Sequence, residues 1–156
     1  LFLRVSAVDG MEGGWTMDDT VAYAKELKTR GVDVIDCSSG GLVGSATVAR
    51  IKRTWGFQVP YAERVRREAD MMSMAVGLIV DPAHAEDILQ KGQADLIAIA
   101  REALVNPCWP QMAEIALGRK AIEAMDDWPV QYGWWLKHRE RSIAQIRADE
   151  AAAGRS

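Results

Sequence analysis

The stretch MAVGLIVDPAHAEDILQKGQADLIAIARE, residues 74–102, contains two apolar runs separated by a helix-like segment. The first run ends at Gly77 and the second ends at Arg101. Pro82 stands where the first turn of a helix would begin, and Gly92 stands where that helix would end. A strand, a helix and a second strand in this order indicate two parallel strands that are joined by a crossover.

The same alternation continues on both sides of this stretch. It predicts strands over residues 1–7, 32–39, 72–76 and 95–99, and helices over residues 17–30, 61–69, 82–91, 109–117 and 132–150. The last two strands are nearly all apolar, as parallel strands with two buried faces are. The sequence therefore predicts an α/β fold. Its βα units form either a small open sheet or half of an eight-stranded barrel.

Composition excludes several classes of function. The 156 residues carry a net charge of −3 without a basic patch, which argues against a nucleic-acid partner. There is no apolar run of membrane-spanning length, and we expect a cytoplasmic protein with no membrane partner. Cys37 and Cys108 make neither a disulfide framework nor a metal-ligand pattern, so no metal site is predicted. The chain begins with Leu1 inside an apparent strand, and we expect a fragment.

The strand ends carry the candidate functional residues, because parallel α/β folds bind ligands at the carboxyl ends of their strands. These ends are Ser6–Asp9, Ser38–Gly41, Gly77–Leu78 and Ala100–Arg101. Small residues let a ligand approach backbone N–H groups, and Arg101 adds a positive charge, so this pattern predicts a phosphate site. Two plainer interpretations stay open: Gly77 only ends a strand, and Arg101 pairs with a nearby carboxylate such as Glu102.

Arg4 lies between Leu3 and Val5 in an otherwise apolar strand. A charge on a buried strand needs a partner. That partner is either the carboxylate of Asp36, in a structural ion pair, or a ligand inside the fold.

Other motifs do not support a function. The segment GMEGGW, residues 10–15, lacks the strand and helix context of a dinucleotide or P-loop motif. The segment SSGG, residues 38–41, has no nearby histidine and no nucleophile-elbow pattern.

Six blocks of the chain resemble, in the same order, flavin oxidoreductases of the old yellow enzyme family, with the bacterial xenobiotic reductases as the most similar branch. The blocks are RVSAVDGMEGGWT (4–16), GVDVIDCSSGG (31–41), GFQVPYAERVRRE (56–68), MAVGLIVDPAHAEDIL (74–89), ADLIAIARE (94–102) and WPVQYGWW (128–135). The resemblance implies that residues 1–140 are the carboxyl-terminal half of an FMN-binding (β/α)8 TIM barrel, strands five to eight with their helices. Residues 141–156 would form a helical, frayed tail.

The resemblance also implies roles for individual residues. Arg4 matches the family's arginine beside the flavin ring, near N1 and O2. Gly77 matches a glycine near the flavin phosphate, and Arg101 matches the arginine that binds this phosphate. Ala100 replaces a family glycine, which keeps the backbone N–H and narrows the space beside the phosphate.

Trp134 and Trp135 occupy the region from which related enzymes send a side chain towards the active-site rim, in some cases that of a neighbouring subunit. In this family the first four strands carry the substrate-binding histidines, the tyrosine proton donor and the other flavin contacts. No catalytic residue is therefore assigned in this chain.

The function that the resemblance implies is an FMN-dependent, NAD(P)H-using ene-reductase that reduces an activated alkene or another acceptor. The chain would lack the first four βα units, need the missing amino-terminal half-barrel and be inactive alone. The full-length enzyme would be a homo-oligomer. The alternatives are a non-catalytic half-barrel or truncated product, the reductase end of a fused aryl-CoA hydroxylase/oxidoreductase, or another phosphate-binding TIM-barrel enzyme.

Overall fold

The computed structural model describes residues 1–40 and 52–154, which form parts of two compact units, Leu1–Val105 and Asn106–Ser156. The domain boundary that we expected after residue 140 falls inside the last helix, α8 (Val130–Ala153). That boundary stays a prediction.

The first unit is built on a parallel sheet of four strands in the order β1-β2-β3-β4. The strands are β1 (Phe2–Ser6), β2 (Val34–Ser38), β3 (Met72–Ala75) and β4 (Leu96–Ile97). This arrangement confirms the predicted α/β fold with parallel strands. The register places Arg4 of β1 directly opposite Asp36 of β2.

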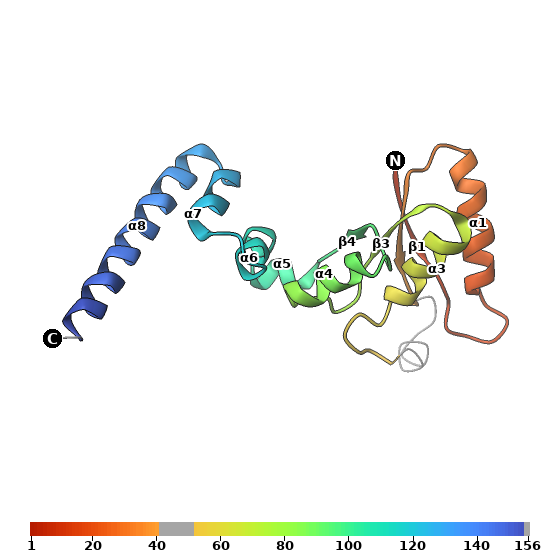
Figure 1. The fold of residues 1–156 in the computed structure, drawn as a ribbon. Helices are drawn as coiled ribbons and strands as arrows, with labels where there is room; N and C mark the ends of the chain where they lie inside the picture. Colours follow the sequence, from red (N-terminus) through yellow and green to blue (C-terminus); the bar gives the residue numbers. More distant parts are fainter. Residues whose placement is uncertain (41–51, 155–156) are drawn as a thin grey trace. The chain divides into compact units, whose positions relative to one another are not determined.

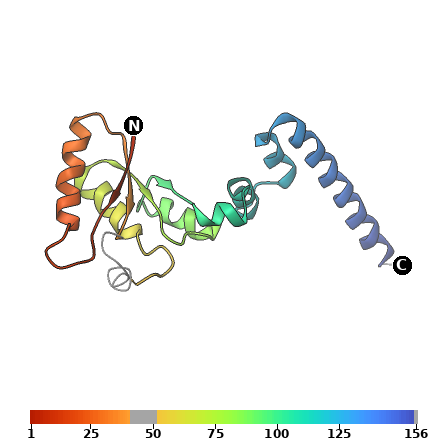
Figure 2. The same ribbon diagram turned by 180° about the vertical axis from the view of Figure 1, so that it is seen from behind.

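Helices α1 (Met17–Thr29) and α3 (Val59–Ala69) lie on the same side of this sheet in both ribbon views (Figures 1 and 2). The cap of α1 explains where it begins. The Thr16 hydroxyl accepts from the Asp19 N–H at 3.3 Å, and the Asp19 carboxylate accepts from the Thr16 N–H at 2.9 Å. This reciprocal pair is a capping box. Helix α4 (Pro82–Gln90) follows β3 and starts with the predicted proline.

The core of the first unit lies between the sheet and its helices. Ile35 and Cys37 of β2, Val65 of α3 and Ile88 of α4 are almost fully buried. Side chains alternate between the two faces of a strand, so Val34 and Asp36 belong to the opposite face of β2 from Ile35 and Cys37.

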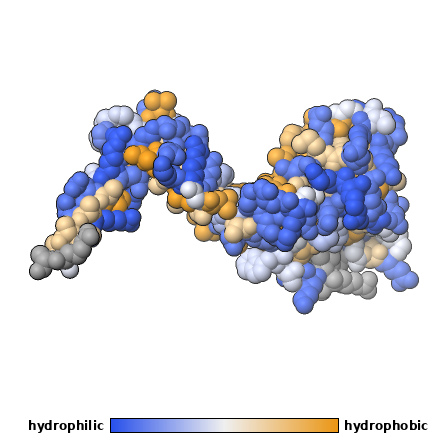
Figure 3. Space-filling view, in the orientation of Figure 1, coloured by the Kyte–Doolittle hydropathy of each residue, from blue (hydrophilic) through white to orange (hydrophobic). Residues whose placement is uncertain are grey.

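That opposite face carries apolar side chains that are exposed. Phe2 is 59% exposed, and its neighbour two strands away, Met72, is 49% exposed. Figure 3 shows apolar surface, in orange, near the start of β1. Parallel sheets are normally covered on both faces. The exposed apolar side chains on this face are therefore typical of a buried sheet face.

The second unit contains α6 (Trp109–Ala116), α7 (Ala121–Ala124), the 3₁₀ helix η1 (Met125–Asp127) and α8 (Val130–Ala153). Gly133 allows α8 to lie close to η1, because a Cβ at this position would lie 2.4 Å from the carbonyl oxygen of Met125. None of the described helices is long and apolar enough to cross a membrane.

Two details differ from the sequence-based expectations. The strand expected at 95–99 narrows to Leu96–Ile97, although the Ala98 N–H still donates to the Ala75 carbonyl at 2.8 Å. The chain then turns into α5 (Arg101–Val105), which was not predicted, and α7 was not predicted either. Helices of five and four residues are too short to show a helical period in the sequence.

Candidate functional site

A cavity of about 630 Å³ opens at the carboxyl ends of the strands, entirely within the unit Leu1–Val105. Small-molecule sites commonly have volumes of roughly 300–1,000 Å³. Its wall comes from β1, from the segments that follow β2, β3 and β4, and from the segment that leads into α3. The lining residues include Arg4, Ser38, Ser39, Gly40, Arg53, Phe57, Gln58, Val76–Val80, Ala98–Glu102 and Val105.

The loop after β3 forms one wall of the cavity and has an unusual backbone. Gly77 has a φ of 115°, and a Cβ there would lie 2.9 Å from Oε1 of Gln58. The conformation therefore requires glycine, and any larger residue would also press on the Gln58 side chain. The next residue, Leu78, has a φ of 53°, which few non-glycine residues adopt. Such strain occurs often at functional sites.

Three backbone N–H groups in this region lack an acceptor among the described residues. The N–H groups of Gly77, Leu78 and Ala100 donate to no other described residue. All three residues line the cavity. Backbone N–H groups that face a ligand are common donors to phosphate oxygens. The arrangement is suited to an anion.

Arg101 begins α5 and lines the same cavity. Its side chain makes no ion pair with any described residue, so the plainer interpretation, a pair with Glu102, is not found. Glu102 lines the cavity as well. A guanidinium that pairs with none of the described carboxylates can make a charge-assisted hydrogen bond to a ligand.

Arg4 forms the ion pair with Asp36 that one interpretation predicted, and its contact with a ligand stays a prediction. Its Nη1 lies 3.3 Å from Oδ2 of Asp36, and its side chain also lines the cavity. The Arg4 side chain is 57% exposed, whereas that of Asp36 is 13% exposed. Burial raises the pKa of the Asp36 carboxyl, and the charge of Arg4 lowers it in part. Oδ1 of Asp36 is buried and has no hydrogen-bond partner among the described residues.

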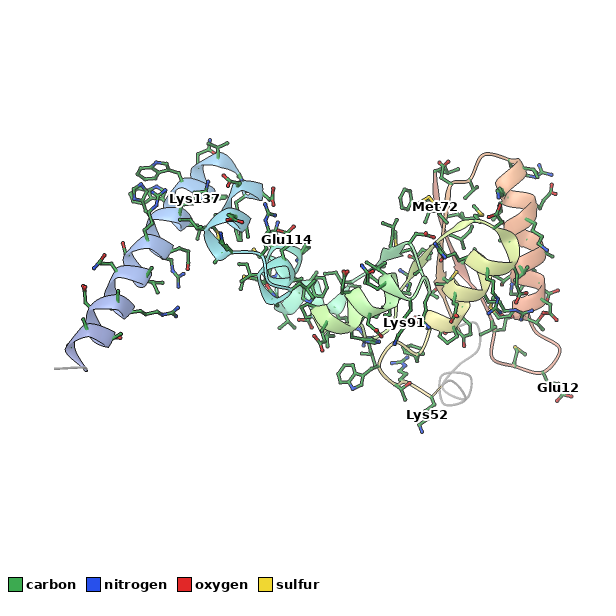
Figure 4. The ribbon with its side chains drawn as sticks, viewed as in Figure 1. Glu12, Lys52, Met72, Lys91, Glu114 and Lys137 are labelled. Carbon is green, nitrogen blue, oxygen red and sulfur yellow. The ribbon has the colours of Figure 1, made fainter. Side chains whose placement is uncertain are left out.

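Sequence reasoning missed Gln58 and Arg53. The buried Gln58 side chain donates from Nε2 to the Ser39 hydroxyl at 2.7 Å, and it also contacts the position of Gly77. It therefore joins the loops that follow β2 and β3. Arg53 lines the cavity beside Lys52, which Figure 4 labels at the point where the described chain resumes. Neither residue belongs to a spacing pattern, and only the fold brings them to the site.

The other sequence candidates divide into three groups. Ser38, Ser39 and Gly40 line the cavity as expected, and Gly41 lies outside the described residues. The segment Ser6–Asp9 does not line it; the Asp9 carboxylate instead accepts from the N–H of Trp15 at 2.8 Å.

Trp134 and Trp135 lie on α8 in the second unit, with exposed fractions of 54% and 68%. Their rings are nearly perpendicular, in a T-shaped arrangement with a centroid distance of 4.5 Å. Their predicted place at an active-site rim stays a prediction.

The donor set of the cavity fits a phosphate-bearing organic ligand. It offers the guanidinium groups of Arg4, Arg53 and Arg101, hydroxyls, and N–H groups on small residues. Across the described part of the chain, no group of three His, Cys, Asp or Glu side chains could hold a metal ion.

Comparisons with known proteins agree with this geometry. The model of the NADH:flavin oxidoreductase / NADH oxidase family matches residues 1–120. An NADPH dehydrogenase of Geobacillus sp. (strain WCH70) is 50% identical over 118 residues, which cover 76% of this chain and 34% of that protein. An NADPH dehydrogenase of Geobacillus thermodenitrificans is 48% identical over 136 residues, 86% of this chain and 37% of that protein.

An NADPH dehydrogenase of Bacillus subtilis is 47% identical over 136 residues, 86% of this chain and 38% of that protein. The chain thus spans 34% to 38% of the lengths of these three relatives.

Proposed function

The chain belongs to the NADH:flavin oxidoreductase / NADH oxidase family, and on that premise we propose that its cavity holds the phosphate and part of the ring of FMN. The fold is then the carboxyl-terminal half of a TIM barrel of the old yellow enzyme type. The parallel order β1-β2-β3-β4 and the exposed apolar face of the sheet support this half-barrel. In the whole protein the amino-terminal half-barrel would cover that face.

The observation that carries the proposal is the convergence of Gly77 and Arg101 on one cavity. Gly77 lies in the loop after β3 and Arg101 begins α5, and each brings to the cavity a donor that pairs with no other described residue. The phosphate of FMN would accept from the N–H groups of Gly77 and Ala100 and from the Arg101 guanidinium. Ala100 fits this role because the replacement of a glycine by alanine keeps the N–H.

Arg4 would contact the edge of the flavin ring near N1 and O2. Its exposed side chain lines the same cavity as Ser38. A cation at this edge stabilises negative charge on the reduced ring. A bound flavin would supply the hydride chemistry between NAD(P)H and an acceptor, while the protein supplies position and charge.

The whole protein would be an FMN-dependent oxidoreductase that uses NAD(P)H. Three relatives are named NADPH dehydrogenases, which supports NADPH as the reductant. We propose an activated alkene as the electron acceptor, a homo-oligomeric assembly with Trp134 and Trp135 near an active-site rim, and a cytoplasmic location. The acid that protonates the product would come from the amino-terminal half.

The experiment is to purify the protein that carries this chain and to measure what it binds. We expect the visible absorbance of an oxidised flavin, which NADPH bleaches in the absence of oxygen and an alkene with an electron-withdrawing group restores. The rival is a barrel enzyme that binds a phosphosugar in the same cavity. A protein that binds a phosphosugar but neither retains nor takes up FMN would contradict the proposal.

A further inference from the structure

We infer that Asp36 is a positioning residue, which holds the Arg4 guanidinium against the cavity and so sets how strongly Arg4 acts on the flavin. This inference rests on the proposed function. Asp36 itself does not line the cavity, whereas Arg4 does. Asp36 therefore acts through Arg4 and not on the ligand.

The geometry of the Arg4–Asp36 pair fits a positioning role. Arg4 and Asp36 are Cα partners in the β1–β2 ladder, so their side chains leave the sheet on the same face. The ion pair of 3.3 Å spans these two strands. Of all the described carboxylates, only that of Asp36 pairs with Arg4.

The two partners are buried to unequal extents. Asp36 is anchored at the centre of β2 with a side chain that is 13% exposed, and the Arg4 side chain is 57% exposed. Arginine has a long side chain that loses much rotamer freedom when it is fixed. Without a fixed carboxylate, the Arg4 side chain would spread over many conformations in the open cavity. The buried partner thus sets the location of the exposed one.

The hydrogen bonds of Asp36 differ from those expected for a purely structural carboxylate. A buried carboxylate that only stabilises the fold would have its oxygens satisfied by the surrounding protein. Oδ1 of Asp36 has no hydrogen-bond partner among the described residues. Asp95 provides the contrast, because one oxygen pairs with Nε of Arg66 at 3.0 Å and the other accepts from the N–H of Ser73 at 2.9 Å.

The test is a double-mutant cycle on the reduction potential of the bound flavin, in the full protein that carries this chain. The potential is measured for wild type, Arg4→Met, Asp36→Ala and the double variant. A positioning role predicts that Arg4→Met lowers the potential, and that in the Asp36→Ala background the same substitution lowers it by less than half as much. Such cycles isolate the coupling between neighbours.

Asp36→Asn is the second variant if Asp36→Ala does not fold. It keeps the shape and loses the charge, so the effect of Arg4→Met should again be smaller than in wild type. Asp95→Asn is the matched control. It also breaks an arginine–aspartate pair at the sheet, but outside the cavity, and it should lower thermal stability and leave the effect of Arg4→Met unchanged.

The outcomes separate the two claims. An equal or larger effect of Arg4→Met without Asp36 would overturn the positioning role and leave the proposed contact of Arg4 with the flavin intact. No effect of Arg4→Met in the presence of Asp36 would overturn both.

Discussion

The two units of the chain bury their side chains to very different extents. The unit Leu1–Val105 has a core of branched apolar residues, such as Ile35, Val65 and Ile88, that are at most 1% exposed. In the described part of Asn106–Ser156 the buried apolar side chains are those of Ala113, Ala124 and Met125. Helix α8 has 24 residues and buries only Gly133.

This difference explains why the candidate site lies where it does. A cavity that positions donors needs a backbone that is fixed by packing. Gly77 follows β3 and Arg101 follows β4, so the packed sheet fixes the positions of both residues at the cavity. Trp134 and Trp135 instead project from a helix whose side chains are largely exposed.

The two cysteines allow the difference in burial to be measured directly, because one lies in each unit. Cys37 is buried in β2, and Cys108 is half-buried at the start of α6. Burial and then the charge of Asp36 raise the pKa of the Cys37 thiol to about 12. At pH 8 its thiolate population is on the order of a thousandfold below that of a thiol with an ordinary pKa of about 8.5.

We therefore expect iodoacetamide to label Cys108 and to spare Cys37 in the folded protein, as measured by mass spectrometry of the peptides. In concentrated denaturant both should react readily, which serves as the control. Rapid labelling of Cys37 in the folded state would show that the first unit is not packed as described.

The next largest effect concerns stability. Ile35→Ala removes a fully buried side chain from β2 and should lower the free energy of unfolding by about 2–5 kcal/mol. Ile146→Ala is the matched control in α8, where the isoleucine is 57% exposed, and it should change stability by no more than about 0.5 kcal/mol. Urea unfolding of both variants measures the difference. Equal effects would mean that the second unit has a core of its own.

The burial of side chains also decides how much of the fold could be predicted from the sequence. The parallel strands and the longer helices were predicted because apolar periodicity records burial. Gly77 and Arg101 were chosen as candidate residues because strand ends in this fold class carry ligands. The end of α1 and the start of α4 followed from local signals, Gly31 and Pro82, that depend only on nearby residues.

The rest could not be predicted, because it depends on contacts between segments that are distant in the sequence. Gln58 reaches Ser39 across 19 positions, and nothing beside Gln58 marks it as a site residue. From the sequence, the partner of Arg4 was either Asp36 or a ligand. The structure shows that an exposed arginine can pair with a buried aspartate and line a cavity at the same time. Short helices such as α7 lack a readable period.

The central claim is that the donors around Gly77 and Arg101 bind the phosphate of FMN, and the most direct test compares FMN with riboflavin, which lacks that phosphate. The dissociation constants of both flavins are measured by fluorescence quenching with the apoprotein that carries this chain, its Arg101→Ala variant and, as a surface control, Arg30→Ala. Arg30 pairs with Glu26 on α1 and does not line the cavity.

We predict that the wild-type protein binds FMN more tightly than riboflavin. Arg101→Ala should weaken FMN binding by about 1.5–3 kcal/mol, the range for a hydrogen bond to a charged group, and should leave riboflavin binding nearly unchanged. Arg30→Ala should alter neither. Equal affinities of the wild-type protein for the two flavins, or an equal loss of both in Arg101→Ala, would contradict the account.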